Sequence, residues 1–357
     1  MLYHLLTPLA DSIGAFNVFR YITFRTAAAL LTALFISFLL GPVLIRTLER
    51  LHASQPFREI GPDHQHKEGT PTMGGLLILV SLVVSVVLWA ELDSRATWIV
   101  LGLTVGYGIL GFIDDYSKVR KQDSAGIRAR TKLLWQFALG FGVAWLIYTD
   151  PSFDGELAVP FFKDFTPHLG FLYVPLAAMV IVAASNAVNL TDGLDGLAIG
   201  PVMIAAGTFL ILAYAAGHSG IAEYLAIKYV PGSGQLAIFC GALVGGGLGF
   251  LWFNTYPAQL FMGDVGALAL GGALGAIAIV IRQEILLAVV GGVFVVETLS
   301  VMIQVTSFKL TGKRVFRMAP IHHHFEELGW AEQKIVVRFW IISIILALVA
   351  LSSLKLR

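Results

Sequence analysis

Long apolar runs separated by short polar links make up most of the sequence. A transmembrane helix needs about 20 consecutive, mostly apolar residues, and about ten stretches of this chain approach that length. The pattern predicts an all-α, polytopic integral membrane protein with about ten transmembrane helices. The predicted spans are residues 26–45, 74–90, 96–113, 131–148, 171–188, 197–216, 235–253, 265–281, 285–307 and 335–354.

The composition agrees with a membrane protein. Hydrophobic residues make up 57% of the 357 residues and charged residues only 13%, with a mean hydropathy of +0.79. In a soluble domain about 25% of residues are charged. The net charge of +1 gives no indication of a nucleic-acid partner. The single cysteine, Cys240, lies in an apolar run and excludes a disulfide framework, and residues 1–21 lack the features of a signal peptide.

Positive charge is unevenly distributed over the links between the predicted spans. The first, third and ninth links contain clusters of lysine and arginine, whereas each even-numbered link contains one such residue. Because cytoplasmic loops are enriched in lysine and arginine, we expect the odd-numbered links to face the cytoplasm and both termini to lie on the extracytoplasmic side. We expect a single integral membrane domain over residues 1–357, because no linker or internal repeat is evident.

The link at residues 189–196 reads NLTDGLDG and lies between two strongly apolar runs. If the preceding helix continues through it, Asn186, Asn189, Asp192 and Asp195 are three residues apart and share one face. Carboxylates at a membrane boundary are energetically costly, which makes them candidates for a functional site. The alternative is a polar turn in which Asp192 or Asp195 caps the next helix.

Two adjacent aspartates, Asp114 and Asp115, end the third span in the sequence GFIDDYSK. A helix C-terminus already carries partial negative charge, so we expect a compensating cation there: a metal ion, the basic residues Lys118 to Lys121, or both. Adjacent helix positions point about 100° apart, which predicts unequal roles for the two carboxylates. The alternative is a pair of solvated charges at a boundary.

Asp264, in the sequence GDVG, directly precedes the eighth span. Aspartate is a favoured N-cap, which is the structural interpretation. Helix N-termini also attract phosphate, so a metal ion held by Asp264 would lie where phosphate oxygens could join its coordination shell. Lys67 lies in HQHKEGTPTMGG, at a turn marked by Gly69 and Pro71, and is either a positive-inside anchor or a ligand contact.

Three further patterns lie in the ninth span, in the ninth link and in the seventh span. Glu297, Ser300 and Gln304 form a polar stripe on the ninth span, where interhelical hydrogen bonding is the simplest role for Glu297. The ninth link contains PIHHHFE, with histidines at 322–324. Phosphate binding is favoured over zinc for them, because neither HExxH nor CxxC is present. In the seventh span, the small-xxx-small spacing at residues 241, 245 and 249 predicts a close helix-packing face.

The unusual acids and histidines, Glu297 excepted, all fall on odd-numbered links. Clustered carboxylates without soft ligands suit Mg²⁺, and together with lysine and histidine they suit phosphate chemistry. The absence of GxxxxGK[ST] excludes a P-loop ATPase. A secondary transporter would place such charges near the bilayer midplane, whereas the boundary suits an enzyme that joins a soluble substrate to a lipid.

These motifs resemble those of a known enzyme superfamily. GFIDDYSK, NLTDGLDG and GDVG are similar to elements of the polyprenyl-phosphate N-acetylhexosamine-1-phosphate transferases, and TPTMGG and PIHHHFE are typical of the phospho-N-acetylmuramoyl-pentapeptide transferase family. The resemblance covers essentially the whole chain. It implies transfer from UDP-N-acetylmuramoyl-pentapeptide to undecaprenyl phosphate, giving UMP and lipid I, the first lipid intermediate of peptidoglycan synthesis. It also implies Mg²⁺, a homodimer and the bacterial cytoplasmic (inner) membrane, with the active site on the cytoplasmic face.

The resemblance further implies roles for individual residues. Asp264 resembles a metal ligand, and Asp114 and Asp115 lie close to it as catalytic residues, with Asp114 deprotonating or positioning the lipid phosphate. The remaining positions resemble substrate contacts: Lys67, Lys132, Asn189, Asp192, Asp195, Asn254, Phe261, Gln304, His322, His323 and His324. Direct attack and a two-step path through a phosphorylated aspartate both stay open.

Two other functions fit parts of the pattern. One is a sister enzyme that transfers N-acetylglucosamine-1-phosphate to the same lipid, against which the PIHHHFE link argues. The other is a membrane transporter or lipid flippase that uses the boundary carboxylates for ion coupling. Release of UMP distinguishes a transferase from a transporter.

Overall fold

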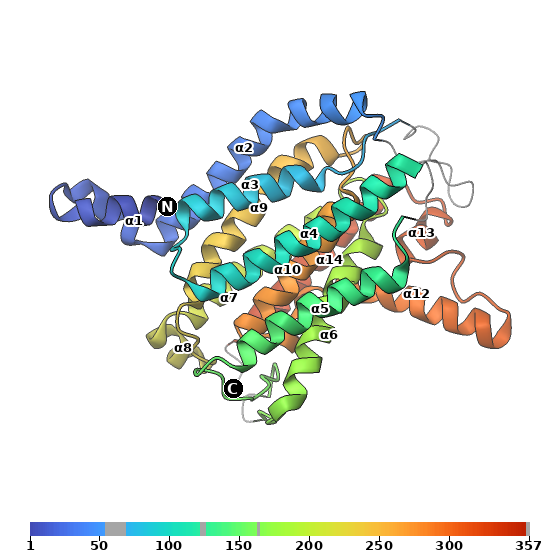
Figure 1. The fold of residues 1–357 in the computed structure, drawn as a ribbon. Coiled ribbons are helices and arrows are strands. Elements are labelled where there is room, and N and C mark those ends of the chain that lie inside the picture. The colour runs from blue at the N-terminus through green and yellow to red at the C-terminus, as the bar shows by residue number, and fades with distance from the viewer. Residues whose placement is uncertain (54–68, 122–125, 163–164, 355–357) are drawn as a thin grey trace.

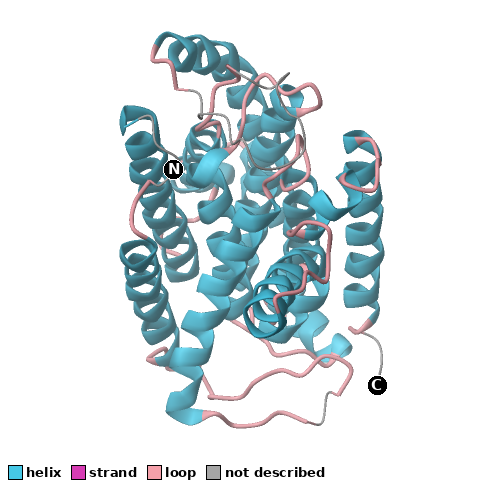
Figure 2. Cartoon of the chain, turned by 90° about the vertical axis from the view of Figure 1, so that its right-hand side faces the viewer, coloured by secondary structure: helices cyan, strands magenta, loops and turns pink. Residues whose placement is uncertain are grey.

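The computed structural model describes residues 1–53, 69–121, 126–162 and 165–354. Within these ranges the regular secondary structure is helical, and an isolated β-bridge joins Glu156 and His168. The helices lie side by side as a bundle, with the links gathered at its ends (Figure 1 and Figure 2). The all-α prediction is confirmed.

Each of the ten predicted spans lies in helical structure. The long helices are α2 (Ile22–Arg50), α3 (Gly75–Trp89), α4 (Arg95–Lys121), α5 (Ala129–Tyr148), α6 (Tyr173–Thr191), α7 (Ile199–Ala216), α9 (Leu236–Asn254), α10 (Gly263–Val280), α12 (Gly292–Thr311) and α14 (Glu332–Ser352). In the described part of the chain, eight of them are long and apolar enough to cross a membrane. The exceptions are α3, with 15 residues, and α5, in which Lys132 and Gln136 lower the hydropathy. The chain is an integral membrane protein.

Short helices fall outside the predicted spans or at their ends. They are α1 (Leu2–Leu6), α8 (Ser219–Leu225), α11 (Glu284–Val290) and α13 (Ile321–Glu326). The prediction of one continuous ninth span over residues 285–307 is wrong, because α11 ends before Gly291 and α12 begins after it. Two consecutive glycines weaken a helix at this point. α12 then extends away from the other helices (Figure 1). Only 22% of the residues in its most apolar 18-residue stretch are buried.

α10 lies in the middle of the bundle (Figure 1), and its residues from Val265 to Val280 are all buried. Its glycines allow neighbouring helices to approach closely. A Cβ at Gly271 would lie 2.5 Å from the Ala184 carbonyl oxygen of α6, and one at Gly266 would lie 2.9 Å from the Gly75 Cα of α3. This packing brings the N-terminal end of α10 beside the ends of α3, α4 and α6, where the polar motifs lie.

α9 packs against α2 through the glycine face predicted from the sequence, which is confirmed. A Cβ at Gly245 would lie 2.0 Å from the Leu30 carbonyl oxygen, and one at Gly249 would lie 2.2 Å from the Ser37 Cβ. These positions therefore accept no side chain without movement of the α2 backbone.

Contacts between the described parts of the odd-numbered links place them together at one end of the bundle, which we call the site end. There the Gly74 N–H donates to the Phe261 carbonyl oxygen at 2.7 Å. At the opposite end, the amino group of Met1 donates to the Val87 carbonyl oxygen at 2.6 Å, and Arg95 pairs with Asp150. The links that carry the candidate catalytic residues therefore share one face of the molecule.

We expect Gly245→Ala to destabilise the protein by about 1–3 kcal/mol, because the added methyl group overpacks the contact between α9 and α2. Thermal unfolding of the detergent-solubilised protein measures this as a lower unfolding temperature. Gly207→Ala on α7 is the matched control, since a Cβ there has no heavy atom within 4 Å. Equal unfolding temperatures for the two variants would contradict the close-packing interpretation.

Candidate active site

Three carboxylates from two helix ends meet at the site end of the bundle. Asp114 and Asp115 come from the C-terminal part of α4 and Asp264 from the first turn of α10, and one oxygen of each lies within 4.8 Å of the others. Met262 occupies the N-cap position of α10, so the interpretation of Asp264 as a helix cap is wrong. The three residues could hold a metal ion.

Each of these carboxylates uses one oxygen to accept a hydrogen bond from a neutral group. The donors are the Ile127 N–H to Asp114 Oδ1 at 2.7 Å, the Val265 N–H to Asp115 Oδ2 at 3.1 Å and the Asn189 side-chain amide to Asp264 Oδ1 at 2.7 Å. These bonds fix the orientation of each carboxylate. The second oxygen of each is left to face the centre of the cluster.

Two lysines supply positive charge to this centre. The Lys118 Nζ lies 2.7 Å from Asp114 Oδ2, 3.5 Å from Asp115 Oδ1 and 3.0 Å from Asp264 Oδ2. The Lys132 Nζ lies 2.6 Å from the same Asp264 oxygen and 3.6 Å from Asp114 Oδ2. Sequence reasoning named Lys118 only among several basic residues. Its spacing of three and four residues from the two aspartates on one helix was the signal that it belongs to the site.

The NLTDGLDG link turns away from its helix. α6 ends at Thr191 and Asp192 has non-helical backbone angles, so the prediction that Asp192 and Asp195 share a helical face with Asn189 is wrong. Asn189 points to Asp264, whereas Asp195 Oδ2 accepts the Ala258 N–H at 3.0 Å from the link between α9 and α10. The first residue of the motif therefore contacts the carboxylate cluster, and its second aspartate contacts the link between α9 and α10.

Asn254 and Phe261 lie in the same region, at the end of α9 and in the link before α10. The Asn254 Oδ1 accepts the Gly196 N–H at 2.9 Å, and its side chain is buried. The Phe261 N–H donates to the Pro71 carbonyl oxygen at 2.9 Å. Both residues join the α9–α10 link to other parts of the site. Lys67 lies outside the described residues.

The three histidines have separate partners. His322 is buried and its Nδ1 lies 3.1 Å from Glu297 Oε2, which confirms hydrogen bonding as a role for Glu297. The His322 ring also lies against Gly193, where a Cβ would be 2.3 Å from Nε2. The other two contacts are His323 Nδ1 to Glu326 at 2.6 Å and the Arg317 N–H to His324 Nδ1 at 3.1 Å. This arrangement gives no support to a shared zinc site.

Gln304 holds the segment that precedes the histidines. Its Oε1 accepts the N–H groups of Val315 and Phe316, each at 2.9 Å, and its Nε2 donates to the Phe316 carbonyl oxygen. Both the oxygen and the nitrogen of the Gln304 amide are therefore hydrogen-bonded to the backbone of residues 315–316. Gln304 thus fixes the conformation of this segment.

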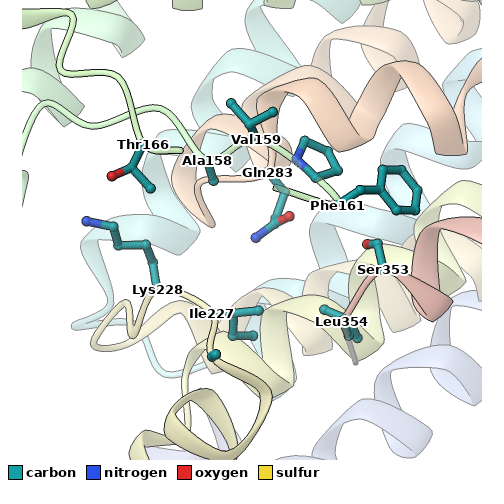
Figure 3. Close-up of a pocket in the computed structure, with 11 residues that line it drawn as sticks. Ala158, Val159, Phe161, Thr166, Ile227, Lys228, Gln283, Ser353 and Leu354 are labelled. Carbon is teal, nitrogen blue, oxygen red and sulfur yellow. The ribbon is translucent and has the colours of Figure 1, made fainter. Parts of the chain in front are cut away.

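A pocket also lies at the opposite end of the bundle, away from the carboxylates. Figure 3 shows Thr166 and Lys228 on one side of it and Phe161 and Ser353 on the other. Lys228, which follows α8, is paired with Asp154 and Glu156, so carboxylates of the link between α5 and α6 neutralise its charge. None of the predicted site residues is among the described residues that line this pocket.

Comparisons with known proteins agree with the motifs. A family model described as glycosyl transferase family 4 matches residues 97–282, and a phospho-N-acetylmuramoyl-pentapeptide-transferase signature matches residues 67–79. Proteins named phospho-N-acetylmuramoyl-pentapeptide-transferase from Pelobacter propionicus and Geobacter sp. (strain M21) are 58% and 59% identical to this chain over 358 residues, covering 100% of each chain. The chain belongs to this family. The family predicted from the motifs is confirmed, and the protein is a membrane transferase.

Burial among the site carboxylates raises the pKa of Asp192 to about 8, and the negative charges of Asp264, Asp115 and Asp195 add to this effect. An unfolded aspartate has a pKa of about 3.9. The folded protein therefore keeps a proton that the unfolded chain loses, so this contribution to stability is present at low pH and is lost as the pH rises toward 8.

We predict that Asp192→Asn, which keeps the shape and removes the titration, raises the unfolding temperature relative to the unmodified protein, and that the increase is much larger at pH 9 than at pH 5. Thermal unfolding from pH 5 to 9 in a chelator tests this. A constant difference between the two proteins over the whole range would show that Asp192 does not titrate in it.

Proposed function

We propose that the protein transfers phospho-N-acetylmuramoyl-pentapeptide from its UDP-linked donor to undecaprenyl phosphate, giving lipid I and UMP. The observation that carries the proposal is the convergence of Asp114, Asp115 and Asp264 with two lysine ammonium groups at one end of a membrane-spanning bundle. Full-length relatives named phospho-N-acetylmuramoyl-pentapeptide-transferase support the choice of substrates. We place the site end on the cytoplasmic face of the bacterial inner membrane, where a UDP-linked donor is available.

Mg²⁺ is the metal ion that we assign to this centre, with Asp264 as a ligand and Asp114 and Asp115 as the neighbouring oxygen donors. The donor set fits, because it contains carboxylate oxygens and no sulfur, as hard cations prefer. When bound, Mg²⁺ would neutralise phosphate charge and stabilise the charge that develops during transfer.

The reaction forms one bond to phosphorus and breaks another. An oxygen of the lipid phosphate attacks the β-phosphorus of the donor, and the bond from this phosphorus to the bridging oxygen breaks, so that UMP leaves with the electron pair. Both reactants are anionic, so the ammonium groups of Lys118 and Lys132 lower the barrier by neutralising charge. The lipid phosphate has a second pKa near 6 and is largely ionised at neutral pH, so Asp114 chiefly orients it.

The remaining site residues either contact the UDP-linked donor or position the links that surround it. Asp192, His323 and His324 are assigned as donor contacts by the family resemblance, as is Lys67. Asn254 and Gln304 are bonded to backbone, and we assign them the role of positioning the links that surround the donor. The homodimer that the resemblance implies stays a prediction.

The most direct test offers purified protein the UDP-linked muramoyl-pentapeptide, undecaprenyl phosphate and Mg²⁺, and measures UMP. We expect UMP and lipid I in equal amounts, and Asp264→Asn should lose at least about 100-fold in kcat, as expected when a charge-stabilising group is removed. Faster reaction with UDP-N-acetylglucosamine would identify the sister enzyme. Movement of lipid across vesicles without UMP release would identify a transporter.

A second prediction separates Asp114 from Asp115. Asp114 Oδ2 lies closer to Lys118 and also contacts Lys132. Asp114 is bonded to the backbone of the link before α5, whereas Asp115 joins α4 to the backbone of another core helix, α10. We expect Asp115→Asn to lower both thermal stability and kcat, and Asp114→Asn to lower kcat with little loss of stability. If Asp114 removes a proton, high pH should partly restore kcat in Asp114→Asn, and an orienting role gives no restoration. Identical profiles of kcat against pH and equal losses of stability would show that the pair acts as one unit.

A further inference from the structure

The centre of the carboxylate cluster is occupied by the ammonium group of Lys118. Each of the three carboxylates contributes one oxygen to this group, at 2.7, 3.0 and 3.5 Å. An ammonium has three N–H donors, so a single lysine can satisfy three acceptors from three residues. Three converging carboxylate oxygens are also what a hard divalent cation requires. The same oxygens therefore suit either cation, and they cannot hold both in one place.

Lys132 reinforces this competition. Its ammonium lies 2.6 Å from Asp264 Oδ2, the oxygen that Lys118 also contacts. Both lysine side chains are mostly buried, with relative exposures of 15% and 17%. With the three carboxylates ionised, the two lysines reduce the charge of the centre from −3 to −1. A divalent cation added to this arrangement would lie within a few ångströms of two ammonium groups in a region of reduced dielectric constant, where repulsion is strong.

We propose that Lys118 acts as a built-in substitute cation, which neutralises the carboxylates in the metal-free protein and is displaced when Mg²⁺ binds. The inference rests on the proposed function, which places Mg²⁺ at these carboxylates. Lys118 rather than Lys132 is the exchanging group, because it contacts all three carboxylates and Lys132 contacts two.

The surroundings of Lys118 are consistent with such a role. Its side chain is flexible and starts one helical turn beyond Asp114, on the same helix. Gly126 lies against it, where a Cβ would be 2.9 Å from the Lys118 Cε and 2.6 Å from Asp114 Oδ1, and its backbone φ of +55° favours glycine. The carboxylates themselves need not move, because each is held through its other oxygen by Ile127, Val265 or Asn189.

Two consequences follow from the exchange. The affinity for Mg²⁺ in the absence of substrate is lower than the three carboxylates alone would give. In addition, the displaced ammonium needs an anion, and a phosphate bound beside the metal ion provides one. Mg²⁺ and a phosphate-containing substrate should therefore bind cooperatively.

Calorimetric titration of the metal-free protein with Mg²⁺, without substrates, tests the exchange. We expect Lys118→Met to bind Mg²⁺ roughly tenfold more tightly than the unmodified protein, because the competing charge is gone. Lys118→Arg keeps the charge and should bind as weakly as the unmodified protein. Lys121→Met, an exposed position on the last turn of α4, is the matched control and should change nothing.

Thermal unfolding gives a second readout that does not depend on activity. Without Mg²⁺, Lys118→Met leaves the three carboxylates with one lysine, so its unfolding temperature should fall, and Mg²⁺ should restore it by more than it raises that of the unmodified protein. If Lys118→Met folds only when Mg²⁺ is present, the result agrees with the exchange for the same reason.

Mg²⁺ affinities that are equal in the unmodified protein and Lys118→Met, or weaker in the variant, would overturn the exchange and leave the proposed metal site intact. If the unmodified protein and Lys118→Met both bind no Mg²⁺, the exchange and the metal assignment fail together. Asp264→Asn provides the reference for a lost site, since it removes the charge of the proposed metal ligand.

Discussion

Mutual repulsion among three closely spaced carboxylates is the constraint on which the site depends. Asp114 and Asp115 lie in the C-terminal part of α4 and Asp264 in the first turn of α10, so the three acidic side chains could not meet there without positive charge between them. Lys118 and Lys132 supply that charge, and neutral donors hold the outer oxygen of each carboxylate. The close packing of α10 against α6 and α3 through its glycines fixes the distance between the two helix ends. The spacing of the charged groups in the site therefore depends on the glycines that pack α10 in the core.

Several polar side chains around this centre bind the backbone of the surrounding links. Asn254 holds the turn at Gly196, Gln304 holds the segment at 315–316, and Asp195 holds the link before α10. His322 is buried between Glu297 and Gly193. Hydrogen bonds to the backbone of these links satisfy its polar groups and give the links a defined shape.

The sequence predicted the helices well because each apolar run is long and bounded by polar residues. It failed at Gly291, which lies inside an uninterrupted apolar run, so no change of polarity marks the break between α11 and α12. It also failed in NLTDGLDG, where local spacing suggested a helical face but the chain turns after Thr191 to reach the α9–α10 link. The pairing of His322 with Glu297 joins residues far apart in sequence and depends on tertiary packing. Boundary positions, in contrast, correctly placed the three aspartates on one face, and the family resemblance implied that they are neighbours, as the structure shows.

The central claim is that Asp114, Asp115 and Asp264 surround a single cation position. Crystals of the protein grown with Mn²⁺ in place of Mg²⁺ would locate the ion directly by its anomalous scattering. The account predicts one strong peak among the free oxygens of the three carboxylates, with the Lys118 ammonium moved away from it. A peak elsewhere, or a peak bound to Asp264 with Lys118 still seated on all three carboxylates, would contradict it.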